Sequence, residues 1–444
     1  NFLRARAEMK KLHWKAVFTM ATALLLSGCA ENNPDPIQEW AVNVGGPAYT
    51  GVDGIVYVAE EYVSGGETGS LETVLGSQDE PLYLSYRVGD IRVDKPLENG
   101  VYDVILHFAE PEEIGGKERL FDVLVNGETR VESLDVMVSR DGKIRSGLTV
   151  AFPNVHVTDG RLQIEFEAIR REPILSAVVV RGKPVATDRW SLVWQDEFDY
   201  EGPPDPSKWN LEEWPARKVN DEDQAYTSRP KNVRVKDGNL VIEAHKEDFD
   251  SAKYTSGRIQ SQGKGDFLYG RIEARAKLPR GMGSWPAIWM LPSDPFTYAT
   301  TCSAGADWQG SADCDAWPNS GEIDILEHVG YEMGHIHGTV HTKAYYWAVW
   351  EQRKGRILVD DVDEAFHDYV VEWSPERIDM YVDDSLYFTY VNEGEGWEVW
   401  PFDKPFHVII NIAVGGMWGR AGGGIDDSIF PQRLLVDYVR VYES

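Results

Sequence analysis

Three carboxylate side chains lie within one short apolar segment in the second half of the chain. The segment reads Glu-Ile-Asp-Ile-Leu-Glu from Glu322 to Glu327 and is flanked by Gly321 and Gly330. A short apolar run bounded by turn residues predicts a β-strand. Because side chains alternate along a strand, Glu322 and Asp324 share one face, whereas Glu327 is expected on the other. One extra residue, a β-bulge, would bring Glu327 back beside the other two acids.

Acids on one sheet face repel each other, and glycoside hydrolysis is a reaction that needs them there. It uses one ionised carboxylate and one protonated acid beside a sugar–sugar bond, and a separation of roughly 5–5.5 Å gives retention through a covalent glycosyl-enzyme. Crowding raises at least one pKa, which keeps an acid protonated near neutral pH. We assign Glu322 as nucleophile, Glu327 as general acid/base and Asp324 as the carboxylate that tunes Glu322. A solvated acidic strand face and a cation site are the alternatives.

The flanking sequence resembles glycoside hydrolase family 16 along most of residues 190–444. GEIDILE at 321–327 resembles the family's active-site strand, and its bulged form looks like the laminarinase, agarase and carrageenase branch. Other blocks follow in the family's order: WQDEFD (194–199), SGRI (256–259), YGRIEAR (269–275), WPAIWML (285–291), FH (366–367), EW (372–373), NIAVGG (411–416) and VDYVRVY (436–442). The resemblance implies a concanavalin-like jelly roll in which a polysaccharide lies across a concave cleft.

Aromatic platforms and convergent polar groups recognise sugars, because sugar rings present apolar C–H faces and a fringe of hydroxyls. Trp285 and Trp289 are four residues apart in a strand-like segment, which places both on one face. The family resemblance supplies the rest of the predicted substrate-binding set, which is Glu222, Arg258, Trp285, Trp289, His341 and Trp418. Core packing is the alternative for each tryptophan. Ala225 stands where the family usually carries an aromatic residue.

The resemblance also implies a structural calcium ion on the convex side, held by Glu197, the backbone of Gly238 and Asp437. Carboxylate and carbonyl oxygens suit a hard cation, which would tie the first and last strands together. Solvated surface acids are the alternative. No cofactor is expected for catalysis. The four histidines between residues 328 and 341 match no metal-ligand motif.

The start of the chain resembles an export signal. Three lysines at 10–15 precede the apolar run 16–26, which is too short to span a membrane as a stable helix. Leu-Ser-Gly-Cys ending at Cys29 resembles a bacterial lipobox, so we expect a lipid-anchored, exported bacterial protein, at the outer membrane; a plain secretory signal is the alternative. In an exported protein, Cys302 and Cys314 suggest a disulfide, with free thiols as the alternative.

The region before the hydrolase-like segment is rich in short β-runs separated by Gly and Asp turns. These runs lie at 82–86, 102–108, 121–125, 162–166 and 177–180. Their spacing predicts a β-sandwich without convincing helices. VNVGG (42–46), LHFAE (106–110) and FDVLVNG (121–127) resemble malectin-like carbohydrate-binding domains, which makes Tyr57, Tyr83 and Tyr86 candidate ligand contacts, with ordinary packing as the alternative.

These patterns divide the chain into five parts and predict an all-β protein with two β-sandwich domains. The parts are the signal segment (1–29), a tether (30–38), the malectin-like domain (39–183), a linker (184–189) and the catalytic domain (190–444). The formal charge of −29 becomes −33 when residues 1–29 are removed. This charge disfavours nucleic acid and polyanionic substrates. It favours a neutral glycan, and we expect a monomer that contacts the membrane only through its lipid.

The activity that these features favour is retaining endo-hydrolysis of β-1,3-glucan. Mixed-linkage glucan, β-1,3-galactan and agar-type polymers are alternative substrates, because cleft loops rather than the hexapeptide read the linkage. A transglycosylase and a non-catalytic surface glycan receptor are alternative functions. The intact acids Glu322, Asp324 and Glu327 argue against the receptor, since binding alone does not need them.

Overall fold

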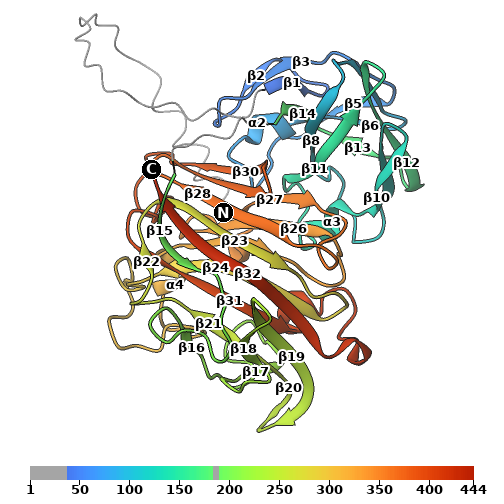
Figure 1. Ribbon diagram of the computed structural model, residues 1–444. Coiled ribbons are helices and arrows are strands. Elements are labelled where there is room, and N and C mark those ends of the chain that lie inside the picture. The colour runs from blue at the N-terminus through green and yellow to red at the C-terminus, as the bar shows by residue number, and fades with distance from the viewer. Residues whose placement is uncertain (1–37, 184–189) are drawn as a thin grey trace, which may run out of the picture. The chain divides into compact units, whose positions relative to one another are not determined.

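The computed structural model describes residues 38–183 and 190–444, and Pro36–Ser444 form one compact unit (Figure 1). The predicted signal segment, the lipidation site Cys29 and the linker 184–189 lie outside the described residues. Within the described residues, no helix combines the length and the apolar character needed to cross a membrane. Almost all regular structure is β-strand, as the sequence predicts.

The first module, residues 38–183, is a β-sandwich. Its strands are β1 (Gln38–Asn43), β2 (Tyr49–Thr50), β3 (Val56–Ala59), β4 (Val63–Ser64), β5 (Glu67–Ser70), β6 (Ser85–Val88), β7 (Arg92–Pro96), β8 (Gly100–Phe108), β9 (Leu120–Val125), β10 (Glu128–Leu134), β11 (Leu148–Val157), β12 (Arg161–Arg170), β13 (Ile174–Leu175) and β14 (Ala177–Gly182). One layer has the order β11-β8-β14-β1-β3-β2 and the other β10-β9-β12-β7-β4, with β13-β6-β5 as a small third sheet. Phe108, Phe121 and Phe166 pack together between the layers.

Two helical turns interrupt the first module, although its sequence shows no convincing helix pattern. They are α2 (Glu80–Tyr83) and α3 (Val136–Ser139). The predicted strand at 82–86 is therefore wrong in its first half, since those residues end α2 before β6 begins. Pro81 lies in the first turn of α2, where a missing N–H costs nothing and a fixed φ favours the helix.

The second module, residues 190–444, packs two large sheets face to face. Its strands are β15 (Ser191–Asp196), β16 (Asn210–Leu211), β17 (Gln224–Tyr226), β18 (Val233–Lys236), β19 (Asn239–Phe249), β20 (Ala252–Ser256), β21 (Arg258–Gln260), β22 (Asp266–Phe267), β23 (Gly270–Lys277), β24 (Ser284–Pro292), β25 (Glu322–Glu327), β26 (His335–His341), β27 (Arg353–Leu358), β28 (His367–Trp373), β29 (Arg377–Val382), β30 (Ser385–Val391), β31 (Phe406–Val414) and β32 (Gln432–Glu443). Its short helices are α4 (Ala316–Asn319), α5 (Gly416–Gly419), η1 (Trp347–Val349) and η2 (Asp427–Ile429).

The sheet that carries the acids has the order β16-β21-β31-β24-β25-β26-β27, and β17-β20-β19-β32-β23-β28-β29-β30 forms the opposite sheet. Buried side chains such as Ile288, Ile323 and Ile410 from the first sheet join Val371 and Val439 from the second in one core. The core therefore lies on one face of the acid-bearing sheet, which leaves the other face available for a cleft.

The two modules are continuous through β27 and β11, which pair in parallel at Ile357 and Ala151. This pairing extends the acid-bearing sheet into a 14-stranded sheet. Strand β8 shows the consequence: Leu106 packs in the first module's own core, whereas its neighbour Ile105 belongs to the core that includes Tyr387 of β30. A strand buried on both faces is apolar without alternation.

The strand that carries the acids contains the predicted bulge. Asp324 pairs with Trp289 of β24 and Leu326 pairs with Ile288, so Ile325 is the extra residue. The pairing with β26 is irregular over the same residues. Ile325 is 1% exposed and lies in the core next to Leu326. The bulge is thus confirmed: Ile325 and Leu326 both lie in the core, and Glu327 returns to the face of Asp324.

Replacing the bulged residue by alanine should destabilise the fold without altering the spacing of the acids. Ile325→Ala removes a fully buried side chain, which we expect to lower the free energy of unfolding by about 2–5 kcal/mol. Urea-induced unfolding measures the change. Leu192→Ala, at a position that is 47% exposed, is the control and should change stability by less than about 0.5 kcal/mol. Equal effects of the two substitutions would contradict this account of the bulge.

Candidate active site

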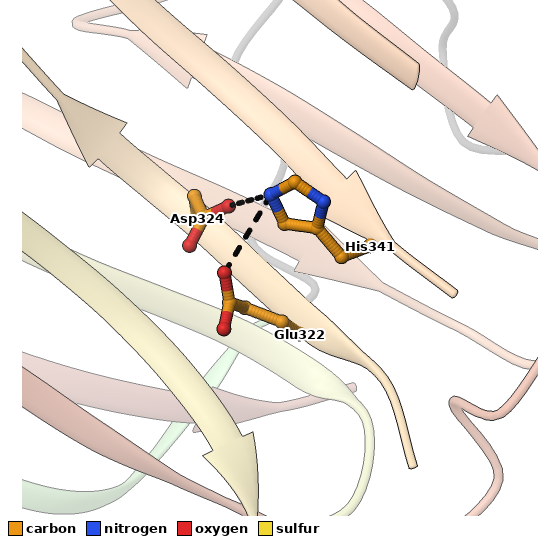
Figure 2. A group of neighbouring side chains, drawn as sticks. All are labelled: Glu322, Asp324 and His341. Carbon is orange, nitrogen blue, oxygen red and sulfur yellow. Dashed lines mark ion pairs between the residues drawn. The ribbon is translucent and has the colours of Figure 1, made fainter. Parts of the chain in front are cut away.

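The three predicted catalytic acids share the open face of the sheet. Neighbouring strand β26 places His341 opposite Glu322, and its Thr339 opposite Asp324. Figure 2 shows the side chains of Glu322, Asp324 and His341 converging on that face. Asp324 is buried, whereas Glu322 and Glu327 are half-buried and keep access to solvent. The outer two acids can therefore meet a ligand while the middle one supports them.

Burial raises the pKa of every acid in the group, and repulsion by neighbouring acids adds to the rise at Glu322 and Asp324. The pKa of Glu322 rises to about 8 and that of Glu327 to about 7, with desolvation as the largest cause for both. Asp324 has a pKa well above its usual range, again first through desolvation and then through the charges of Glu322 and Glu327. Asp324 therefore holds a proton and donates it to Glu322 in a hydrogen bond.

Two donated hydrogen bonds favour the ionised form of Glu322. One comes from Asp324, and the other from the indole of Trp317, whose Nε1 lies 3.0 Å from Oε2 of Glu322. Glu327 accepts a bond from Trp285, whose Nε1 lies 3.1 Å from Oε1. The extra donor at Glu322 offsets part of the rise that burial causes, although the pKa of Glu322, about 8, still lies above that of Glu327, about 7.

The imidazole of His341 is a neutral neighbour of two acids. Its Nε2 lies 3.6 Å from Oε1 of Glu322 and 3.5 Å from Oδ2 of Asp324 (Figure 2). Burial lowers the pKa of His341 to about 3, so these contacts are not ion pairs. Ligand atoms of these three residues lie within 4.8 Å of one another, close enough to hold a metal ion. However, Asp324 is protonated and Glu322 already accepts a bond from an indole. These two features suit an acid–base site better than a metal site.

Trp317 is a site residue that the sequence did not identify by role. It lies in the loop between β24 and β25, where Cys302 and Cys314 form a disulfide. Asp315 accepts backbone N–H bonds from Thr300 and Thr301, which holds the two ends of the bridged segment together. The loop shows no strand or helix periodicity, so only proximity in the chain to Glu322 could have indicated its function.

Trp285 and Trp289 both lie on the cleft face, as their even spacing predicts. Trp289 pairs with Asp324 across the strands and donates from Nε1 to Oδ1 of Asn411, at 2.8 Å. Trp418 packs edge-on against Trp285, with ring centroids 5.5 Å apart. All three indoles are half-buried, so each keeps surface that a sugar ring can cover.

Arg258 and Glu222 lie beneath the cleft rather than on its surface. The buried guanidinium of Arg258 pairs with Glu212 and lies 4.9 Å from the ring centre of Trp289. Buried Glu222 accepts hydrogen bonds from Gln224 and Tyr226, at 2.7 and 3.1 Å. Their carboxylate and guanidinium groups are occupied by protein partners, so both residues support the aromatic surface.

A buried lysine near the acids lies on β27, two strands away from β25 in the same sheet. Lys354 of β27 pairs with Thr339 of β26, which places it on the cleft face. Its Nζ lies 5.0 Å from the ring centre of Trp418. Its charge lowers the pKa of Glu327, while Asp141 of the first module raises it. This neighbour could not be found from the sequence, because it depends on the register of two strand pairs.

The predicted calcium ligands do not fit a cation. Both carboxylate oxygens of Glu197 accept from Arg440, at 2.8 Å each, and that interaction lowers the pKa of Glu197. Asp437 lies 3.5 Å from Nε of Arg275. Guanidinium groups already neutralise the acids that were assigned to calcium, so the proposed ion lacks a suitable ligand set around Gly238.

Two of the candidate ligand contacts of the first module are buried between the modules. Tyr57 and Tyr83 are buried, and they line a cavity of about 90 Å³ whose other wall includes Arg353 and Tyr387 of the second module. Tyr83 also bonds to His107, at 2.9 Å. Ordinary packing thus explains both rings, whereas Tyr86 remains half-buried.

Two family models match the chain. The model of the glycosyl hydrolases family 16 matches residues 220–439, and that of the malectin domain matches residues 38–185. A beta-glucanase of Rhodothermus marinus is 48% identical over 286 residues, which cover 62% of this chain and 94% of that protein. The match therefore covers nearly the whole length of this relative.

Solved structures agree with these matches. A laminarinase from Rhodothermus marinus is 49% identical, with a TM-score of 0.52 over 57% of this chain and 97% of its own. A non-specific endo-β-1,3(4)-glucanase from family 16, crystallised with a glucan oligosaccharide, is 39% identical, with a TM-score of 0.53 over 59% of this chain and 98% of its own. The chain belongs to family 16 of the glycosyl hydrolases and carries a malectin domain before its hydrolase domain.

Proposed function

We propose that this protein is an endo-acting glycoside hydrolase that cleaves β-1,3-glucan with retention of anomeric configuration. The observation that carries the proposal is the bulged strand, which brings Glu322, Asp324 and Glu327 to one face beside half-buried indoles. The laminarinase and beta-glucanase relatives support β-glucan as the substrate. A strongly acidic protein and an aromatic cleft also favour a neutral polymer.

The first step of the mechanism forms a glycosyl-enzyme. Ionised Glu322 attacks the anomeric carbon, while Glu327 transfers its proton to the departing glycosidic oxygen. Asp324 keeps its hydrogen bond to Glu322, and Trp317 donates to Oε2 of that carboxylate. These donors hold the nucleophile in place and favour its charged form before attack.

The second step releases the sugar. Glu327 is now ionised and takes a proton from the attacking water, and Glu322 is the leaving group. The same carboxyl must therefore hold and lose a proton near neutral pH, which a pKa of about 7 allows. Burial raises that pKa, while Lys354 and the indole N–H of Trp285 limit the rise.

The substrate is tested by comparing polymers that differ in linkage and sugar. We expect reducing ends from laminarin, less from lichenan, and none from β-1,3-galactan or agarose, with the β-anomer as first product by NMR. Glu322→Ser should lower the rate by roughly 10⁴-fold or more, because no other group replaces the nucleophile. Glu395→Ser, at an exposed loop position, is the control.

Other outcomes of that experiment favour the other functions. Release from galactan or agarose alone would replace the substrate class, and longer chains in the product mass spectrum would indicate a transglycosylase. Full activity of Glu322→Ser would overturn the assignment of the nucleophile. Binding of every polymer without any release would support a glycan receptor.

Removing the indole N–H of Trp317 should reduce the fraction of Glu322 that is ionised. Trp317→Phe deletes the N–H that bonds to Glu322, so the pKa of Glu322 rises and less enzyme carries the ionised carboxylate. We expect kcat to fall by roughly 10- to 100-fold, the effect of one hydrogen bond to a charged group. The acid limb of the pH–rate profile should also move to higher pH. Trp308→Phe, in the same loop, is the matched control, and an equal loss there would contradict the specific role.

Removing the buried amino group of Lys354 should shift the alkaline limb of the pH–rate profile. Glu327 must be protonated in the first step, so the rate falls as pH rises through its pKa. Lys354→Met removes a charge that favours the ionised form, which raises this pKa by roughly 0.5–1 unit and moves the limb to higher pH. The profile of kcat/KM on laminarin measures the shift. Exposed Lys236→Met should leave it unchanged, and a downward shift in Lys354→Met would contradict the electrostatic account.

A further inference from the structure

Four consecutive apolar side chains are exposed on the loop between β26 and β27. Residues 347–350 read Trp-Ala-Val-Trp, and all four are exposed. Trp347 is 44% exposed and Trp350 is 47% exposed. Among the tryptophans of residues 38–183 and 190–444, only these two are exposed to this degree; the others are buried or half-buried. Exposed apolar groups gathered in this way mark a contact surface rather than ordinary packing.

This aromatic segment begins directly after a ring that contacts the indole bonded to the nucleophile. Trp317 donates to Glu322, and its ring centre lies 5.6 Å from that of Tyr346, packed edge-on. Trp347 follows Tyr346 directly in the chain and starts η1. The half-buried rings of Trp317 and Tyr346 therefore connect the reacting carboxylate to the start of the exposed segment.

Contacts from both sides hold the exposed segment in one conformation. The ammonium of Lys143, itself buried, donates to the backbone oxygen of Trp347, at 3.0 Å. The backbone N–H of Trp350 donates to the same oxygen, at 3.2 Å. The next residue, Glu351, accepts from the backbone N–H of Gly76, at 3.1 Å, and pairs with Arg353. A segment fixed in this way presents its indoles without a large ordering cost on binding.

We propose that Trp347 and Trp350 form a second contact surface for the glycan, an extension of the cleft beyond Glu322. The occupant is a further stretch of the neutral β-linked polysaccharide that is being cleaved, because its apolar ring faces suit exposed indoles. The identity of the polymer rests on the proposed function. The same glycan chain, rather than a separate partner, is the occupant because Tyr346, which directly precedes Trp347, contacts the ring that bonds to the nucleophile.

The test separates long substrates from short ones. Trp347→Ala and Trp350→Ala should each raise KM for polymeric laminarin by roughly 3- to 10-fold, the effect of one lost aromatic contact. Values of kcat, and kcat/KM for the shortest laminari-oligosaccharide that is cleaved, should stay unchanged, because the acids and their donors are untouched. Trp350→Phe should restore part of the affinity. Leu192→Ala, an exposed apolar residue of β15, is the matched control.

A binding measurement without turnover distinguishes this proposal from the proposed function. Laminarin should retard Glu322→Ser in affinity electrophoresis, and adding Trp347→Ala and Trp350→Ala should reduce the retardation. Retardation without any wild-type hydrolysis would reject the proposed function and keep the contact surface. Hydrolysis with unaltered KM and retardation in the double variant would reject the surface alone. Equal losses on long and short substrates, or a change of oligomeric state in the double variant, would also overturn it.

Discussion

The bulge at Ile325 is the constraint on which the active site depends. Without the extra residue, the spacing of five between Glu322 and Glu327 would direct one acid into the core and the other into the cleft. The core accepts the bulge because Ile325 and Leu326 are both apolar and both buried. The same six residues thus satisfy two demands, a dry face with consecutive aliphatic side chains and a wet face with three acids.

Placing three acids together costs electrostatic free energy, and the surrounding groups change the pKa of each acid to a different extent. Desolvation raises every pKa, so the group cannot hold three charges near neutral pH. Hydrogen bonds from Trp317 and the protonated Asp324 offset part of this rise at Glu322 and so favour its ionised form. Glu327 receives only an indole donor and a more distant cation, which leaves it able to exchange its proton.

Local patterns in the sequence predicted the parts of the site that follow from strand periodicity. Alternation and spacing located the acids, the need for a bulge and the shared face of Trp285 and Trp289. Trp317 was not assigned because its loop has no periodicity, and Lys354 was not assigned because it reaches the cleft through the register of two other strand pairs. The pairing of Glu197 was not predicted for the same kind of reason, since Arg440 lies far away in the sequence. For Tyr57 and Tyr83 the sequence left ligand contact and packing open, because the second module that covers them could not be placed from the sequence.

The pairing of β11 with β27 has a further consequence for solubility. An edge strand exposes unpaired N–H and C=O groups, which invite association with other chains. In this protein β27 has a neighbour on each side, so the acid-bearing sheet has no free border there. The malectin domain therefore shields the backbone of the hydrolase sheet from edge-to-edge aggregation, a protective role that is independent of any sugar it binds.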